Sequence, residues 1–415
     1  MQAKTEPAAT RPAVLLAMLL VVYSFNFLDR QILGILAQPV KADLGLSDTQ
    51  MGALGGLSFA LFYSTLAIPL GLLADRTSRS GVIAASLAVW SGFTALCGMA
   101  GNFTQMFLFR LGVGVGEAGG VAPSYALIAD RFPPHQRGRA IAVYSLGIPL
   151  GSAAGALFGA AIAEAVNWRT AFIVLGVAGL LFTLPFRLLV KEPVRSSTLA
   201  TPPAMEVFRD LASKPVFWLM SFGAAMGSIC GYGLAFWIPA LLQRSQHLSM
   251  MQTGQFLGVQ VLTAGTIGIL AGGWLADRLG KKDRANHVRL PAMSYLLGIP
   301  CLAAGFMADS PVAAFFWLLL PSALTYFWVS PVVTAVQHLV APNARATASA
   351  CFLLINNGIG LGFGALIIGK LSDHLTPTLG DAALRTAMVW SLGCYVLAAG
   401  LMLLAGKRLR AAWRD

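Results

Sequence analysis

Charged residues are scarce in this chain. Asp, Glu, Lys and Arg make up 11% of its 415 residues, and a soluble protein of this length would carry roughly twice that fraction. Cysteine is scarce as well, because the five cysteines all fall in apolar runs and none forms a C-x-x-C pair. The composition therefore argues against an ordinary soluble domain, and the cysteine pattern implies neither a disulfide nor a metal site.

The signatures of the common enzyme classes are also missing. The sequence has no P-loop, no metal-ligand spacing and no nucleophile–base pair. A G-x-G-x-x-G pattern at Gly114, Gly116 and Gly119 lies within an apolar helix with no strand before it, so we reject a dinucleotide site. We predict that the protein is not an enzyme and that it needs no cofactor or metal.

Long apolar stretches dominate what is present. Hydrophobic residues make up 57% of the chain, which divides into about twelve stretches of membrane-spanning length. We predict an all-α polytopic membrane protein with twelve transmembrane helices in two six-helix bundles, 1–190 and 214–415. The linker between them, 191–213, contains Pro and Ser and a short amphipathic helix that begins near Glu206. The predicted spans are 13–37, 50–74, 81–100, 104–129, 139–163, 168–190, 215–243, 252–276, 289–308, 312–340, 346–370 and 384–406.

The net charge of +12 could indicate a nucleic-acid partner, but its distribution indicates a membrane topology instead. With the N-terminus inside, 22 of the 29 Lys and Arg residues fall in cytoplasmic segments and five fall in outside loops. This bias follows the positive-inside rule. It predicts a multi-pass protein of the inner (plasma) membrane with both termini in the cytoplasm and no nucleic-acid partner. The outside cations are Lys41, Arg169, Arg244, Lys370 and Arg385.

One short signature occurs twice. Gly71-Leu-Leu-Ala-Asp75-Arg76 ends one apolar run, and Gly273-Trp-Leu-Ala-Asp277-Arg278 ends another, 202 residues later. A duplicated helix end indicates two related halves, which in a membrane chain is typical of a transporter. Positive-inside topology alone would explain these charges, but their matched positions favour a latch that holds the cytoplasmic side closed in one state. The predicted gate residues are Gly71, Asp75, Arg76, Arg79, Asp130, Arg131, Arg137, Gly273, Asp277, Arg278 and Lys281.

Four charged residues lie inside predicted spans: Asp29, Arg30, Arg110 and Glu117. Each is costly in lipid, so each should face a cavity or a partner. They could form two structural ion pairs. Alternatively, Asp29 and Glu117 serve proton coupling, and Arg30 or Arg110 holds an anionic group, because a guanidinium stays charged and offers a fork that matches phosphate or carboxylate.

The second half has no comparable charge in the middle of a helix. A charged wall that faces an apolar and aromatic wall suits an amphipathic ligand, although core or interfacial packing explains each aromatic residue singly at least as well. The predicted substrate-binding residues are Arg30, Arg110, Tyr232, Phe236, Trp237, Tyr326, Trp328 and Asn356.

Glycine recurs every four residues on the fifth predicted span, at Gly147, Gly151, Gly155 and Gly159, and similar spacings occur within 254–272 on the eighth. Rows of small residues let two helix backbones approach closely. Static packing and a gating interface between the two halves explain these rows equally well.

The repeated Gly-x-x-x-Asp-Arg loops resemble the signature loop of the major facilitator superfamily, although the first copy has Ser78 where that family usually has Gly. Within the superfamily the chain is most similar to spinster-like proteins, in the segments 26–30, 110–118, 123–130 and 147–152. This resemblance implies the major facilitator fold and proton-linked transport of lysolipids or sphingoid phosphates by alternating access. It also implies that Asp29, Arg30, Arg110 and Glu117 form the polar centre.

We therefore predict a proton-coupled secondary transporter of an amphipathic, lipid-like anion, driven by the proton gradient and working as a monomer among membrane lipids. An organic-anion or sugar-acid symporter and a hydrophobic drug efflux transporter are the alternatives within transport. A non-transporting receptor or scaffold is the alternative outside it, and it would not need paired carboxylates in the membrane.

Overall fold

The computed structural model describes residues 10–192 and 203–413, without the side chains of Pro134, Ala276, Asp277, Pro342 and Ala346. The described residues form helices and no strand. Ten helical stretches among them are long and apolar enough to cross a membrane. One of these, Thr347–Ala412, is 66 residues long and contains two predicted spans, and the helices within 103–131 supply a further one. The predicted arrangement of twelve transmembrane helices is confirmed.

The helices of the first half are α1 (Pro12–Ile35), α2 (Ala37–Leu44), α3 (Asp48–Gly55), α4 (Leu57–Arg76), α5 (Arg79–Cys97), α6 (Phe103–Glu117), α7 (Val121–Arg131), α8 (Pro134–Ser145), α9 (Gly147–Ala165) and α10 (Trp168–Leu189). The short helix α11 (Ala204–Ala212) precedes the second half. That half contains α12 (Pro215–Ser245), α13 (Met250–Gln260), α14 (Thr266–Gly280), α15 (Asn286–Met307), α16 (Pro311–Leu324), α17 (Val329–Gln337), α18 (Arg345–Leu379), α19 (Ala383–Ser391) and α20 (Gly393–Ala412).

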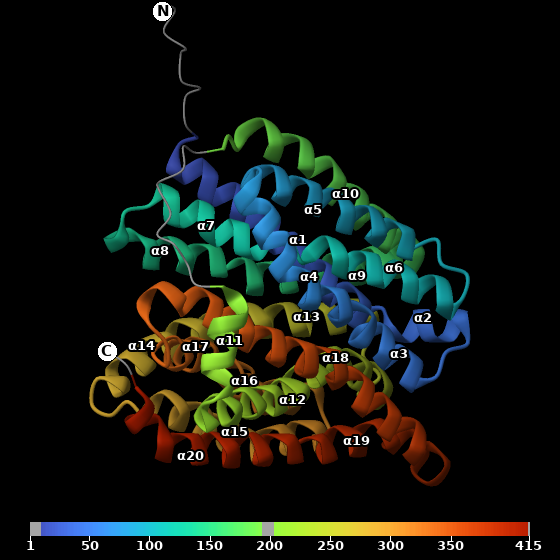
Figure 1. Ribbon diagram of the computed structural model, residues 1–415. Coiled ribbons are helices and arrows are strands. Elements are labelled where there is room, and N and C mark those ends of the chain that lie inside the picture. Colours follow the sequence, from blue (N-terminus) through green and yellow to red (C-terminus); the bar gives the residue numbers. More distant parts are fainter. Residues whose placement is uncertain (1–9, 193–202, 414–415) are drawn as a thin grey trace, which may run out of the picture.

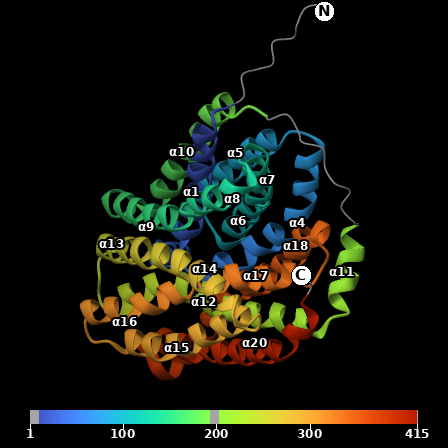
Figure 2. The same ribbon diagram turned by 90° about the vertical axis from the view of Figure 1, so that its left-hand side faces the viewer.

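The two halves of the chain lie side by side. In Figure 1 the blue-to-green helices α1–α10 form the upper part and the helices from α12 onward form the lower part, and Figure 2 shows the same separation from the side. The start of α1 and the end of α20 lie at the same end of the bundle, which we call the near face (Figure 1). The opposite end, with the α2–α3 turn, is the far face.

Several membrane spans are interrupted at points that matter for the site. The break between α6 and α7 falls directly after Glu117, and the break between α16 and α17 contains Tyr326. A π-helical turn at Val261–Gly265 separates α13 from α14. Interruptions of this kind are tolerated at membrane depth only where protein or a polar cavity surrounds the freed backbone groups, and they often occur at functional sites.

The glycine rows have two different roles. A Cβ on Gly151 would lie 2.1 Å from the carbonyl oxygen of Ser24 on α1, so the row on α9 packs within the first half. A Cβ on Gly254 would lie 2.6 Å from the carbonyl oxygen of Ala156, so the contact of α13 with α9 joins the two halves. The row on α9 therefore supports static packing, and so do Gly268 and Gly272, which lie against Ala323 and Phe327 of their own half. Gly254 and Gly258 lie at an interface that must change if the halves move.

Glu192 fastens the end of the first half to the loop that carries the first signature. Its carboxylate accepts hydrogen bonds from the backbone N–H groups of Arg79 and Ser80 and from the hydroxyls of Ser78 and Ser80, over 2.9–3.0 Å. Partial burial opposes ionisation, but these hydrogen bonds outweigh it and lower the pKa of Glu192. The negative charge of Glu192 also lies at the N-terminus of α5, where the positive end of the helix dipole stabilises it.

We expect Glu192→Gln to lower the free energy of unfolding at neutral pH by roughly 0.5–1 kcal/mol, since the group is partly exposed to solvent. Because the folded pKa is lowered, the stabilisation is present above the unfolded pKa of about 4.3 and is lost as the pH falls through the folded value. Thermal melting of the purified protein between pH 7 and pH 3.5 checks this. The difference between the two proteins should shrink on acidification, and a constant difference would contradict the assignment.

Candidate functional site

Arg30 and Glu117 form a buried ion pair within the first half. Arg30 lies on α1, and its Nε donates to Oε2 of Glu117 at the end of α6 over 3.0 Å. The side chain of Glu117 is fully buried, and that of Arg30 keeps 16% of its surface exposed. Removing one partner of a buried pair costs about 3–5 kcal/mol, because the other charge is left without compensation. The two residues are therefore strongly coupled.

Aromatic rings surround the Arg30 guanidinium. Its Cζ lies 5.0 Å from the ring centroid of Phe27, 4.8 Å from that of Phe59 and 4.5 Å from that of Tyr63. Ring faces attract a cation without neutralising it. The rings therefore hold the guanidinium in place, and Glu117 stays its one carboxylate partner among the described residues.

Both partners keep unused hydrogen-bonding atoms. Nη2 of Arg30 and Oε1 of Glu117 are buried without a hydrogen-bond partner among the described residues, and the same holds for Nε of Arg110. Buried polar atoms are normally satisfied, and each exception costs free energy. Unsatisfied donors on two arginines are the arrangement expected of a site that receives an anion.

Asp29 and Arg110 complete the polar centre. They are buried, with 3% and 2% of their surfaces exposed, and they lie close enough to interact electrostatically. No described basic group lies within ion-pair distance of Asp29, and the partner of Glu117 is Arg30, not Arg110, its neighbour on α6. The two independent ion pairs considered from the sequence are therefore not formed in this structure.

One predicted residue of the second half, Tyr232, approaches this centre, and Tyr326 lies next to it. Tyr232 on α12 lies within electrostatic range of Arg30, and Tyr326 lies within range of Tyr232. Asn356 on α18 is fully buried and accepts a hydrogen bond from Ser228 over 2.9 Å. These groups are polar but uncharged.

The other predicted aromatic residues pack in helix contacts. Phe236 of the second half packs its ring directly on Gly55 of α3 in the first half. The contact is so close that a Cβ on Gly55 would lie 2.3 Å from the ring. Trp237 is fully buried and donates its indole N–H to the carbonyl of Ala365 on α18 over 2.8 Å. Trp328 contacts Phe352 edge to ring, with 6.3 Å between centroids.

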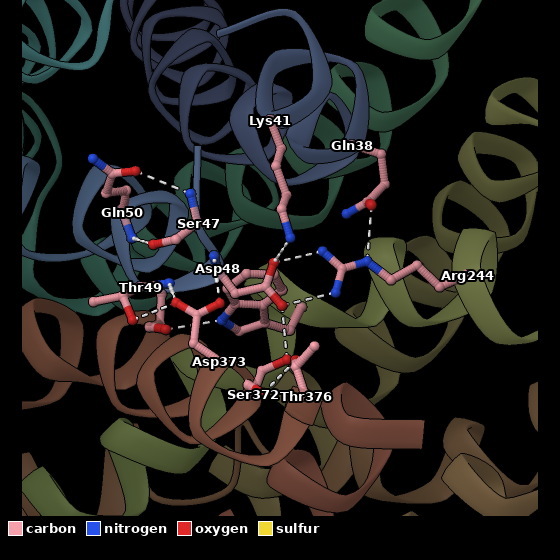
Figure 3. Close-up of polar contacts among 12 residues, drawn as sticks. Gln38, Lys41, Ser47, Asp48, Thr49, Gln50, Arg244, Ser372, Asp373 and Thr376 are labelled. Carbon is pink, nitrogen blue, oxygen red and sulfur yellow. Dashed lines mark hydrogen bonds and ion pairs between the residues drawn. The ribbon is translucent and has the colours of Figure 1, made fainter. Parts of the chain in front are cut away.

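A second charged cluster joins the two halves at the far face (Figure 3). Asp48, at the start of α3, accepts from Lys41 over 2.6 Å, from both Nη atoms of Arg244 over 2.6 and 2.8 Å, and from Ser372 over 2.7 Å. Asp48 is 2% exposed, and Arg244 also donates to Gln38 over 2.8 Å. We call this group of five residues, Asp48, Lys41, Arg244, Ser372 and Gln38, the far-face clasp, because α12 and α18 of the second half hold α2 and α3 of the first.

Helix N-termini are also capped across the halves on this face. Asp373 of α18 accepts from the backbone N–H groups of Asp48 and Thr49 over 3.0 and 2.7 Å, at the start of α3 (Figure 3). Glu164 of α9 accepts from the backbone N–H of Met251 over 2.6 Å, at the start of α13. Each half thus supplies a carboxylate to the positive end of a helix dipole in the other.

The sequence reasoning missed these far-face residues, although a signal was present. Ser47 and Ser249 begin capping boxes at the starts of α3 and α13, and they stand 202 residues apart, as Asp75 and Asp277 do. The duplicated helix starts could therefore have been found by the same offset. The carboxylates of the opposite half that cap these helix starts, Asp373 and Glu164, could not have been found in this way.

On the near face, Arg79 is the centre of the first signature loop. Its Nε and Nη2 donate to Oδ1 of Asp75 over 3.1 and 2.9 Å, and its Nη1 donates to Asp130. Arg131 donates to the carbonyl of Thr10, and Arg137 to that of Phe132. These bonds tie α4, α5 and α7 together within the first half.

The second signature loop is described in part. The side chain of Asp277 lies outside the described residues, and Arg278 lies over the ring of Trp274 at 5.2 Å. Arg76 and Lys281 are exposed, Gly71 lies beside Ala122, and open space surrounds Gly273.

Beyond this loop, Asp283 accepts from Arg289 and from two atoms of Arg410. Hydrogen bonds from Arg410 chiefly lower the pKa of Asp283. Like the pairs around Arg79, these join residues of a single half, in contrast to the far-face clasp.

Comparison with known proteins agrees with this architecture. The sequence model of the Major Facilitator Superfamily matches residues 19–365. An MFS-type efflux pump of Mycolicibacterium smegmatis is 35% identical over 89% of this chain and 87% of its own length. A probable L-galactonate transporter of Escherichia coli is 29% identical over 74% of this chain and 69% of its own. The crystal structure of a bacterial homologue of the human lysosomal transporter Spinster, in an inward-facing and unoccupied conformation, has a TM-score of 0.87 and 28% identity, over 97% of this chain and 98% of its own.

The far-face clasp yields a test of which contacts hold the halves together. Arg244→Lys keeps the charge but loses the two-pronged contact with Asp48, so we expect the population with a separated far face to rise about tenfold or more. Spin labels at positions 42 and 381, on opposite sides of the clasp, report the distance distribution. Arg169→Lys is the matched control, because Arg169 pairs over 2.6 Å with Asp43 of its own half. Equal distributions in the two variants would contradict a role for the clasp.

Proposed function

The chain belongs to the major facilitator superfamily of membrane transporters, and from its site we propose that it is a proton-coupled secondary transporter of an amphipathic, lipid-like anion. The observation that carries the proposal is the Arg30–Glu117 pair, which is buried, ringed by aromatic side chains and incompletely hydrogen-bonded. The helices opposite it carry no charged residue within 215–243 on α12 or 346–369 on α18. A ligand with an anionic head and an apolar tail matches both the charged wall around Arg30 and the uncharged wall of α12 and α18.

A single exchange of partners would couple protons to the ligand. Arg30 can donate to Glu117 or to a ligand anion, and the two acceptors compete for it. Protonation of Glu117 removes the carboxylate charge and leaves Arg30 to the ligand, whereas ionisation of Glu117 takes Arg30 back. Since each partner changes the affinity of the other, proton and ligand binding are linked. Asp29, which has no described ion-pair partner, is the second candidate for proton uptake.

The charged faces fit alternating access. We place the near face and both termini in the cytoplasm of a bacterial inner membrane, because positive charge is concentrated there. The far-face clasp then closes the outside, in keeping with the inward-facing relative. The signature loops around Asp75 and Asp277 would form the opposite latch when the near face closes. The division into bundles at 1–190 and 214–415, and a monomeric working unit, belong to the same proposal.

Two other substrate classes have support from relatives. The name of the Escherichia coli relative favours a sugar acid, for which Arg30 would hold the carboxylate. The Mycolicibacterium smegmatis relative is named an efflux pump, which favours export and so the hydrophobic drug efflux alternative. A sugar acid is polar throughout, and it would leave the uncharged wall of α12 and α18 without a partner. This difference favours the amphipathic anion.

Transport into proteoliposomes tests the proposal. We expect a radiolabelled lysophospholipid to move at a rate that depends on an imposed pH gradient, and L-galactonate to move no faster than in protein-free vesicles. Gradient-dependent movement of galactonate alone would establish the sugar-acid alternative. Movement of neither compound, in protein that binds lysophospholipid, would refute a transport role for this ligand.

Glu117→Gln mimics the protonated carboxyl permanently. We expect it to abolish the response to the pH gradient while gradient-independent exchange or binding continues, because Arg30 remains free for the ligand. Asp29→Asn in parallel separates the two carboxylates. If both variants respond to the gradient as the unmodified protein does, neither carboxylate is the coupling group.

Arg30→Lys tests the anion site. Lysine keeps the charge but cannot form a two-pronged contact, so we expect about a tenfold loss of affinity for the anionic ligand. Equilibrium binding in detergent measures this, with Arg110→Lys as the comparison. Unchanged affinity in Arg30→Ala would end the assignment of Arg30 to the ligand.

A further inference from the structure

A pocket of about 480 Å³ lies on the near face, away from the polar centre, where α12 begins and α20 ends. Trp218, Leu219 and Leu404 form its apolar wall, and Lys407 and Arg408 stand at its rim. The helix α11 runs alongside this corner of the molecule (Figure 2). The indole N–H of Trp218 donates to the carbonyl of Ala212 at the end of α11 over 2.9 Å, which fixes the ring in the wall.

The two cations of the pocket lack acidic partners. Lys407 and Arg408 are exposed and make no ion pair with any described carboxylate, and no acidic side chain lines the pocket. The nearby charges are committed elsewhere: Arg410 to Asp283, and Asp210 to Lys214 over 2.7 Å. Positive charge is therefore concentrated at one opening and is available to an anion from outside the protein.

Apolar surface continues from the pocket toward the middle of the membrane. The ring of Trp218 stacks on Phe222, one turn deeper on α12, with 5.7 Å between centroids, and Phe222 is 40% exposed. On α20, Leu404 is 49% exposed, and Leu397, two turns deeper, is 60% exposed. Cations at the membrane surface above a continuous apolar track match an anionic head group with acyl chains below it.

We propose that this pocket binds an intact anionic phospholipid from the leaflet at the near face, with the phosphate on Lys407 and Arg408 and an acyl chain along Trp218, Phe222 and Leu404. The bound lipid joins α11, α12 and α20, and so anchors the linker helix to the second half. The site is separate from the polar centre around Arg30, and the inference does not rest on the proposed transport function.

Native mass spectrometry of the full chain, titrated with dioleoylphosphatidylglycerol or dioleoylphosphatidylcholine, tests the proposal. We expect the first bound phosphatidylglycerol to be held about tenfold more tightly than phosphatidylcholine, since each basic residue near the surface contributes to the attraction. In Lys407→Gln/Arg408→Gln the preference should fall to about twofold or less. Arg139→Gln/Lys191→Gln is the matched control, because it removes two exposed near-face cations of the first half and should keep the preference.

A pocket-filling variant and a competing head group distinguish this site from non-specific binding of anionic lipid. Leu404→Trp fills the pocket with both charges in place and should also abolish the preference, which covers the case in which the charge variant fails to fold. Glycerol phosphate should not displace the lipid at equal concentration, because it lacks the acyl chain that lies along Trp218, Phe222 and Leu404. Equal affinity for the two lipids, equal loss in the control, or displacement by glycerol phosphate would overturn the proposal.

Discussion

The contact on which the rest of the structure depends is the far-face clasp around Asp48. This carboxylate is almost fully buried between the halves, where it is tolerable only with Lys41 and Arg244 in place. The same face caps α3 and α13 with carboxylates from the opposite half. Separating the halves here would expose two helix N-termini and divide an ion-pair network at once. The far face therefore opens only if other contacts form in exchange.

The near face carries charged groups whose ion pairs lie within a single half. Asp75 and Asp130 hold Arg79 within the first half, and Asp283 holds Arg410 within the second. These charges are satisfied inside each half, so the described ion pairs around Arg79 and Asp283 do not hold the halves together on this face. Between the two faces, Arg30 has one acceptor in Glu117 and one donor atom to spare. At each of these three levels a carboxylate holds a cation in this structure.

The sequence predicted the positions of the helices well, but it predicted poorly which side chains contact one another, and the reason is physical. Membrane-length apolar runs report burial in lipid, which every span shares, so the twelve spans could be read directly. Which side chains meet depends on the rotation and crossing of helices. Arg110 and Glu117 share one face of α6, yet the crossing of α1 brings Arg30 to Glu117. Trp237 and Trp328 pack against helices of their own half for the same reason, and a count of aromatic residues could not separate them from Tyr232.

The duplication was informative mainly where its two copies differ. Both halves keep a capping box and a signature loop at the same offset, because each needs a helix start on one face and a helix end on the other. At the position that matches Asp48, the second half has Met250. The first half therefore carries both the buried carboxylate of the clasp and the charged centre, and the second half contributes Arg244 and an uncharged wall. Two like halves would make a symmetric scaffold, and the departures from symmetry in this chain fall at the far-face clasp and at the buried charged centre.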